Sequence, residues 1–273
     1  MTVAIISSRG DDATVRSVRR ALAILRAFGP ADRSLPLGEI ARRAELDKAT
    51  TRRLLRTLIG ENVVEQHGPS KEYSLGLGVL ELSAGATPVD DLRRRAQPLL
   101  AATAETTGAT ALLAVRHDGA ALCIEAVAGE RPVQAPWSTG ERLPLHACAA
   151  PRVLMAYLPL ETRMAVLSGP LPSLTGGTPT DPFQLATTLE TIRQRGWETG
   201  VDDVIEGVTC LALPVRGEAG EVIAAFAIAG PGEEMLDGDR PLYLELVRSK
   251  VQELERRLGA RPAPPGGSAR RAH

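Results

Sequence analysis

The chain has 273 residues, which suits two domains, and 44% of them are hydrophobic, which is enough for a buried core. The formal net charge is −1, so any basic surface for nucleic acid must be local. Three scattered cysteines, in no Cys-x-x-Cys pair, favour neither a zinc site nor a disulfide framework. The N-terminus has no signal-peptide pattern, and no apolar run approaches the roughly 20 residues that span a bilayer. We therefore expect a cytoplasmic protein without a membrane partner.

Residues 1–14 are expected to form a flexible arm, and residues 15–75 a compact helical unit. The first helix is indicated by apolar residues at helical spacing before Gly29-Pro30, namely Val18, Leu22, Leu25 and Phe28. A second helix is indicated by Leu37, Ile40, Ala41 and Ala44, which fall at i, i+3, i+4 and i+7. The two helices form a base for the helix that follows.

A basic helix is predicted from Lys48 to about Gly60, with Asp47 as its N-cap, because a carboxylate accepts the free N–H groups of the first turn. Its apolar face carries Leu54, Leu55 and Leu58. The residues expected to contact DNA lie toward its N-terminus and its opposite face, and are Lys48, Thr50, Thr51, Arg52, Arg53 and Arg56. Such a helix enters the major groove, where Arg contacts guanine edges or phosphates and Thr contacts thymine methyls or phosphates.

Two short strands, at 63–67 and 72–75, flank the turn-rich tip 68–71. This pattern predicts a β-wing that brings Lys71 near the DNA backbone. The alternative is that the basic helix is merely a solvated face. Charge partition favours DNA binding, because Val15–Leu75 holds twelve Lys and Arg residues against seven Asp and Glu residues in a chain whose net charge is −1.

The remaining chain is divided into a linker helix at 76–88, an effector-binding and oligomerisation domain at 89–258, and a disordered tail at 259–273. Within that domain helices are predicted at 89–107, 145–158, 181–195 and 241–258, with Pro151 interrupting the second, and strands at 109–116, 122–127, 208–215 and 222–228. Grouped strands with intervening helices indicate an α+β domain with an antiparallel sheet. The Arg93-Arg94-Arg95 run is interpreted as a solvated face rather than a second DNA contact.

The chain from about Arg16 to Gly259 resembles the IclR family of bacterial transcription regulators. The resemblance rests on VRRALAILRAF, LGEIARRAEL, KATTRRLLRTL, YSLG, RLPLHACAAPRVLMAYL, the GW and GV pairs at 196 and 207, CLALPV and VIAAFAIAGP, in this order. It implies a winged helix-turn-helix, a linker helix and a GAF-like effector domain. It also implies a homodimer or homotetramer on palindromic double-stranded operator DNA, tuned by a small metabolite.

Several positions depart from the family pattern. Glu45 and Asn62 stand where glycine is usual, Pro151-Arg152 replaces Gly-Lys, and Ala227 and Ala229 replace serines. The expected effector pocket is lined by Leu145, Ala150, Pro151, Leu154, Asp203, Val208, Cys210, Ala227 and Ala229. Because these changes remove hydrogen-bond partners, we expect an apolar or aromatic effector rather than a small keto acid, or a pocket filled by side chains.

Some residues suggest catalysis or metal binding, and each has a simpler structural interpretation. His146 and Cys148, expected on one strand, suggest a nucleophile and its base, but no third orienting group is evident. The carboxylates around Asp203 suggest a metal site, and a solvated loop is favoured instead. Cys210 is either a small buried residue or a pocket residue, and both tryptophans are assigned to the core or an interface. No cofactor, no metal and no enzymatic activity are expected.

Three hypotheses follow. The first is a ligand-responsive DNA-binding regulator, with repression expected rather than activation. The second is a small-molecule enzyme or sensor with a vestigial DNA-binding domain, and the basic helix argues against it. The third is a constitutive DNA-binding protein whose second domain only oligomerises, and the loss of polar groups from the pocket keeps this hypothesis open.

Overall fold

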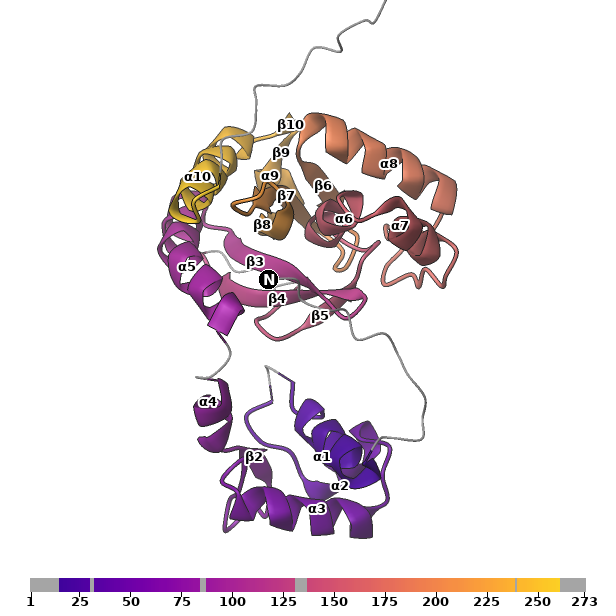
Figure 1. Ribbon diagram of the computed structural model, residues 1–273, viewed down its shortest axis with the longest axis vertical. Helices are drawn as coiled ribbons and strands as arrows, with labels where there is room; N and C mark the ends of the chain where they lie inside the picture. The colour runs from indigo at the N-terminus through magenta and orange to yellow at the C-terminus, as the bar shows by residue number, and fades with distance from the viewer. Residues whose placement is uncertain (1–14, 30–31, 84–86, 131–136, 239, 261–273) are drawn as a thin grey trace, which may run out of the picture. The chain divides into compact units, whose positions relative to one another are not determined.

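The structure is a computed structural model that describes residues 15–29, 32–83, 87–130, 137–238 and 240–260. The chain forms two compact units, Met1–Thr87 and Pro88–His273, which are described separately below (Figure 1). The predicted arm at 1–14 and residues 261–273 of the predicted tail lie outside the described residues. In the part of the chain that the structure describes, no helix combines the length and the apolar character needed to cross a membrane.

The first unit is a helix-turn-helix followed by a two-stranded wing. Its elements are α1 (Arg16–Arg26), α2 (Leu37–Arg43), α3 (Lys48–Gly60), β1 (Val64–Gln66), β2 (Tyr73–Leu75) and α4 (Gly78–Ser83). One core holds α1, α2, α3 and the two strands together, and its largest members include Ile24, Ile40, Leu55 and Tyr73. The strands pair antiparallel, with Glu65 opposite Ser74. The predicted winged helix-turn-helix is therefore confirmed.

Local features of this unit follow from its sequence. The Asp47 carboxylate accepts the Thr50 N–H at 2.8 Å and caps α3 as predicted. Glu45 and Asn62 both have left-handed backbones, with φ of 54° and 57°, where the family pattern led us to expect glycine. In α1 the buried anchor is Ile24, whereas Val18 and Leu22 of the predicted apolar stripe are exposed.

The second unit is built around a six-stranded antiparallel sheet with the order β5-β4-β3-β8-β7-β6. Its strands are β3 (Thr110–His117), β4 (Ala120–Val127), β5 (Arg142–Pro144), β6 (Glu198–Val201), β7 (Val208–Arg216) and β8 (Val222–Pro231). Its helices are α5 (Thr87–Thr107), α6 (Ala149–Ala156), α7 (Leu160–Leu167), α8 (Pro182–Arg195), α9 (Gly232–Met235) and α10 (Leu244–Arg257). A small pair, β9 (Leu236–Asp237) and β10 (Arg240–Pro241), precedes α10.

Helices cover both faces of this sheet (Figure 1). Because strand side chains alternate, Leu211 and Phe226 point into the core under α5 and α10, while their neighbours point into the core under α6. The neighbours on the α6 side are small, with Cys210 opposite Ala229 and Ala212 opposite Ala227. This face therefore lets α6 approach the sheet closely.

Two differences from the predicted elements are informative. Pro151 does not interrupt α6, because it is the third residue of that helix, where an N–H has no intrahelical partner. The short elements β5, β6 and α7 have no counterpart among the predicted elements. Each of these strands has at most four residues, too few for a clear alternation of apolar and polar side chains.

Candidate DNA-binding face and effector cavity

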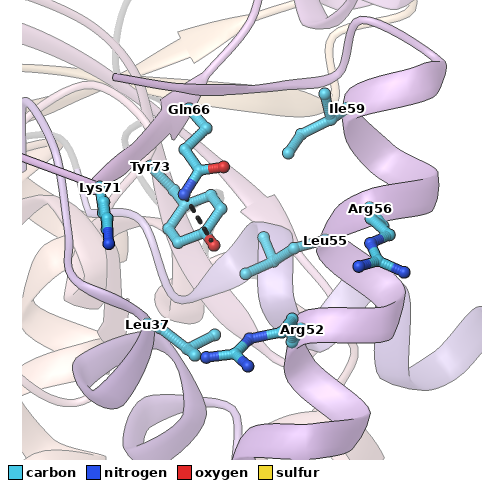
Figure 2. A pocket seen from close by; sticks show the side chains of 8 residues that line it. All are labelled: Leu37, Arg52, Leu55, Arg56, Ile59, Gln66, Lys71 and Tyr73. Atoms are coloured by element: carbon cyan, nitrogen blue, oxygen red, sulfur yellow. Dashed lines mark hydrogen bonds between the residues drawn. The ribbon is translucent and has the colours of Figure 1, made fainter. Parts of the chain in front are cut away.

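A groove of about 430 Å³ lies between α3 and the wing. Three cations surround it, Arg52 and Arg56 from α3 and Lys71 from the wing, and all three are exposed (Figure 2). The remaining lining residues are Leu37, Leu55, Ile59, Gln66 and Tyr73. Gln66 donates to the Tyr73 hydroxyl at 3.2 Å, which fixes the base of the wing. The cations predicted to contact DNA from two separate segments thus share one groove.

The cations of α3 differ from those of the neighbouring helix in their partners. Within the described residues, Lys48, Arg52, Arg53 and Arg56 form no ion pair. The arginines of α2, by contrast, both bind Glu39, through contacts of 2.6 Å and 2.7 Å. Hydrogen bonds from these arginines lower the pKa of Glu39 to about 2. Positive charge on α3 therefore remains available for phosphates.

The two threonines of the predicted DNA contact separate in the structure. Thr50 is half-buried beside the cap. Thr51 is fully buried, and its hydroxyl donates to the Asp47 carbonyl at 2.9 Å. The assignment of Thr51 to DNA contact was therefore wrong, because its side chain faces the core of the unit.

The arginine run of α5 is ion-paired, in agreement with its interpretation as a solvated face. Arg93 binds Glu125 at 2.9 Å, while Arg94 and Arg95 bind Asp91 at 2.6 Å and 2.7 Å. Arg94 remains 70% exposed. These cations are already balanced by local carboxylates.

In the second unit, a small cavity of about 10 Å³, room for about one water, lies at part of the predicted effector pocket. It is lined by Cys148, Gly200, Asp203, Val204, Ile205, Val208 and Cys210. Of the predicted pocket residues, Asp203, Val208 and Cys210 line the cavity. The others are buried around it or in α6, namely Leu145, Ala150, Pro151, Leu154, Ala227 and Ala229.

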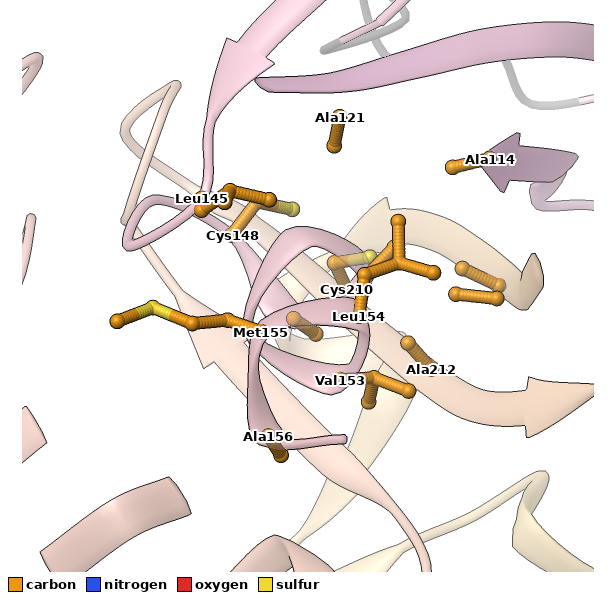
Figure 3. Close-up of a cluster of buried hydrophobic side chains, with 14 of the residues drawn as sticks. Ala114, Ala121, Leu145, Cys148, Val153, Leu154, Met155, Ala156, Cys210 and Ala212 are labelled. Atoms are coloured by element: carbon orange, nitrogen blue, oxygen red, sulfur yellow. The ribbon is translucent and has the colours of Figure 1, made fainter. Parts of the chain in front are cut away.

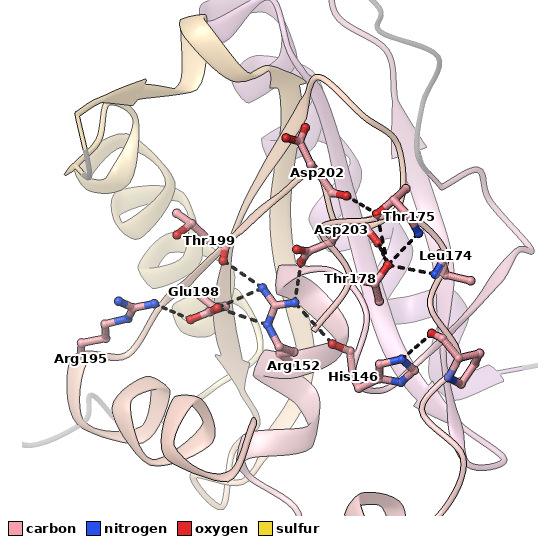
Figure 4. Close-up of polar contacts among 11 residues, drawn as sticks. His146, Arg152, Leu174, Thr175, Thr178, Arg195, Glu198, Thr199, Asp202 and Asp203 are labelled. Atoms are coloured by element: carbon pink, nitrogen blue, oxygen red, sulfur yellow. Dashed lines mark hydrogen bonds and ion pairs between the residues drawn. The ribbon is translucent and has the colours of Figure 1, made fainter. Parts of the chain in front are cut away.

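A buried ion network centred on Arg152 borders this cavity (Figure 4). The Arg152 side chain is 3% exposed and binds Glu198 at 3.0 Å and Asp203 at 2.5 Å. Glu198 also binds Arg195. Burial raises the pKa of Asp203, and the charge of Arg152 opposes that shift. The network joins α6 to β6 and to the segment that follows β6.

This network places a cation in the interior and corrects one interpretation of the sequence. Arg152 is buried and already neutralised by two carboxylates. Asp203 is not in a solvated loop, because it is 5% exposed and paired. No cluster of His, Cys, Asp and Glu suited to a metal ion occurs among the described residues.

His146 and Cys148 lie in the turn before α6 and not on a strand. His146 Nε2 donates to the Pro172 carbonyl at 2.9 Å, whereas the Cys148 thiol lies against Cys210. The two side chains therefore do not form the nucleophile and base considered from the sequence. Trp137 is a core residue, 1% exposed, whose indole N–H donates to the Glu141 carbonyl at 2.8 Å. Trp197 is half-buried under the Arg195 guanidinium.

A winged helix with free cations, joined to a sheet domain with an internal cavity, defines a DNA-binding regulator with a separate effector domain. Comparison with known proteins gives its family. Residues 17–68 match the IclR helix-turn-helix domain, and residues 85–256 match the C-terminal domain of bacterial IclR transcriptional regulators. The chain belongs to the IclR family, whose members are DNA-binding transcription regulators and not enzymes.

Individual relatives support this assignment over most of the chain. A glycerol operon regulatory protein of Streptomyces griseus is 32% identical over 248 residues, covering 90% of this chain and 97% of the relative. The HTH-type transcriptional repressor AllR of Escherichia coli strain K12 is 28% identical over 250 residues, 91% of this chain and 92% of the repressor. An IclR homolog from Microbacterium hydrocarbonoxydans, solved in complex with 4-hydroxybenzoate, has a TM-score of 0.79 and 27% identity, covering 89% of this chain and 98% of that chain.

Proposed function

We propose that this regulator is a cytoplasmic repressor that binds a palindromic operator as a homodimer, through the groove between α3 and the wing. The observation that carries the proposal is the set of free cations from two segments, Arg52, Arg56 and Lys71, around that groove. One winged helix covers one half-site, so specific affinity requires two copies. A dimer can pair further into a tetramer on longer operators. Repression is supported by the repressor among its relatives.

Operator binding by variants of α3 tests this proposal. We expect Arg52→Ala to weaken binding by about 1–3 kcal/mol and to relax specificity at one base pair, if Arg52 contacts a base as we propose. A phosphate-contacting arginine should instead weaken all sequences alike and reduce the salt slope by about one. Arg42→Ala is the matched control, because Arg42 lies on α2 and is paired with Glu39. Binding by the Arg52→Ala, Arg56→Ala double variant as strong as that of the wild type would refute the proposal.

We also propose that the effector is a small uncharged molecule of apolar or aromatic character, bound where the small cavity of the second unit lies. The cavity walls offer Val204, Ile205 and Val208, and the nearest cation, Arg152, is already balanced by two carboxylates. An anionic ligand would find no free positive charge to offset its desolvation. The relative solved with 4-hydroxybenzoate supports the aromatic class alone, because that ligand is a carboxylate anion.

Binding at this site requires the segment 202–207 to move, because the cavity has room for about one water. This segment is held by the buried Arg152–Asp203 ion pair and by further hydrogen bonds. The Gly207 N–H donates to the Asp202 carboxylate at 2.6 Å, and the Thr178 hydroxyl donates to the Asp203 carbonyl at 2.6 Å. An apolar ligand would displace Val204 and Ile205 from the cavity and take their place against β7.

A thermal-shift series with matched ligands tests the effector class. Methyl 4-hydroxybenzoate and 4-hydroxybenzoate differ in charge, so we expect the neutral ester to stabilise the protein more than the acid. Small keto acids such as glyoxylate should have no effect. Stabilisation by the keto acids alone would refute the proposal. No stabilisation by any of these compounds would favour the second candidate, a constitutive DNA-binding protein, which the small size of the cavity supports.

A further inference from the structure

We propose that Cys148 and Cys210 form an oxidisable thiol pair, a modification site at which a peroxide converts two buried thiols into a disulfide. The site lies in the second unit, between the first turn of α6 and strand β7. It goes beyond the proposed function and does not depend on the identity of an effector or an operator.

The two thiols are placed together by the fold. Both line the same small cavity, beside Gly200 and Asp203. They are 4% and 2% exposed, and both belong to the cluster of buried side chains around α6 (Figure 3). Cys210 lies on the face of β7 that α6 covers, opposite Ala229, so a small neighbour leaves room for both sulfur atoms.

The surroundings activate one thiol of the pair. Cys148 is the N-cap residue of α6, at the helix end that carries free N–H groups, and the Arg152 charge follows one turn later. The hydrogen bond from Cys210 and the charge of Arg152 lower the pKa of Cys148, although burial opposes the shift. The same hydrogen bond raises the pKa of Cys210. Cys148 is therefore the thiol that ionises first and attacks.

The backbone conformation of Cys148 also marks this residue as functional. Its φ and ψ are 65° and 159°, a region that only glycine adopts readily. Such conformations persist where the surrounding structure imposes them, and they concentrate at functional sites. Here the conformation sets the sulfur of Cys148 at the cavity, next to Cys210.

The third cysteine provides an internal contrast. The Cys123 thiol donates to the Glu125 carbonyl at 3.4 Å and does not line the cavity. Burial raises the pKa of Cys123 to about 12. Cys123 should therefore remain a thiol under conditions that oxidise the pair.

One molecule of hydrogen peroxide oxidises the two thiols to a disulfide. The Cys148 thiolate attacks one oxygen of hydrogen peroxide, the O–O bond breaks, and the released hydroxide takes a proton to become water. The Cys210 sulfur then attacks the sulfenic acid on Cys148, the S–O bond breaks, and a second water leaves with the Cys210 proton. The two thiols lose two electrons in total and the peroxide gains them. The product ties the start of α6 to β7 across the cavity.

Peroxide treatment of the full-length reduced protein tests the proposal, followed by acid quenching, alkylation and peptide mapping without reductant. We expect the wild type to lose two thiols, to give a linked peptide pair containing Cys148 and Cys210, and to retain a free Cys123. Cys123→Ala should react as the wild type does. Cys148→Ala should slow thiol loss by more than about tenfold, because it removes the thiolate. Cys210→Ala should stop at a sulfenic acid on Cys148 that dimedone traps.

The peptide map of the wild type tests the proposal by itself, so the test does not depend on whether a variant folds. Oxidation of Cys123 before the pair, disulfides only between protein copies, or retention of all three thiols in peroxide that oxidises a model dithiol would each overturn the proposal.

Discussion

Glu45 occupies a left-handed backbone position in the turn between α2 and α3, with φ of 54°. This conformation crowds the Cβ atom against the following carbonyl and costs a non-glycine residue about 1–2 kcal/mol. We expect Glu45→Gly to stabilise the first unit by about 0.5–1 kcal/mol, after the larger backbone entropy of glycine in the unfolded chain is subtracted. Hydrogen exchange of the α2 and α3 amides in the intact protein measures this change.

Asn62→Gly is the matched control for this prediction. Asn62 has a φ of 57°, but asparagine tolerates this region better than glutamate does. Its replacement should therefore give a smaller gain. Equal gains at both positions, or destabilisation by Glu45→Gly, would show that the conformation at Glu45 is not strained.

The sequence contained enough information to place some site residues and not others. Glu45 and Asn62 were singled out because glycine is usual there, and both have positive φ. Thr51 lies four residues before Leu55, so helical spacing alone would have placed it on the buried face. Arg152 was harder to place, because a charged residue is usually exposed and its two partners lie 46 and 51 residues away in the chain.

The ion network of Arg152 connects α6 to β6 and the cavity wall. Replacement of Arg152 by Met would leave Glu198 with only Arg195, and Asp203 buried without a cation. Removing one partner of a buried pair typically costs about 3–5 kcal/mol, so we expect a loss of that size in chemical denaturation monitored by tryptophan fluorescence. Adding Asp203→Asn to the Arg152→Met variant should recover part of the loss.

Arg163→Met is the control for the Arg152→Met variant. Arg163 is also largely buried, but its partner Glu190 is 57% exposed and can be hydrated when the pair is lost. Its loss of stability should therefore be clearly smaller than that of Arg152→Met. If the two variants lose the same stability, the Arg152 network has no special role in joining α6 to the sheet.

Helix α2 should show a pH dependence that comes from Glu39. Hydrogen bonds from Arg42 and Arg43 lower the pKa of this carboxyl from 4.5 to about 2. A folded-state pKa below the unfolded value means that the stabilisation is present above 4.5 and is lost as the pH falls toward about 2. Glu39→Gln should therefore speed exchange of the α2 amides near neutral pH, relative to wild type.

The difference between Glu39→Gln and the wild type should shrink at about pH 3, because protonation weakens the same ion pairs in the wild type. Glu65→Gln is the control, since Glu65 has no ion pair among the described residues. A difference that does not change with pH would mean that the charge of Glu39 does not stabilise α2.

At the scale of the whole molecule, local patterns predicted the element types better than their arrangement. The helix and strand periods placed α3, β3, β4, β7, β8 and α10 within a few residues of their bounds. The pairing of β3 with β8, which joins residues about 115 positions apart, is not contained in those periods. The grouping of strands and helices indicated the α+β class. The GAF-like assignment and the pocket came from the family resemblance, which carries information on tertiary contacts that one sequence lacks.

The small volume of the cavity also could not be predicted from the sequence. Substitution of serines by Ala227 and Ala229 indicated a less polar pocket, and both alanines do lie on the face under α6. The volume that remains depends on how closely α6 and the segment 202–207 pack against that face. Such packing is set by many side chains together, so no single position in the chain predicts it.

Exposed leucines at α4 indicate a surface that joins two copies of the chain. Leu77, Leu80 and Leu82, in and before α4, are 68%, 66% and 69% exposed, which is unusual for three leucines in one short segment. Removing each from water stabilises a dimer by about 1.5–3 kcal/mol, so we expect a dimer at micromolar concentration by light scattering.

Leu80→Glu should give monomers and weaken operator binding more than tenfold, because two half-sites are no longer bound together. Glu81→Ala keeps the leucines and should remain a dimer. A monomeric wild type, or a dimeric Leu80→Glu variant, would show that this segment does not join the copies.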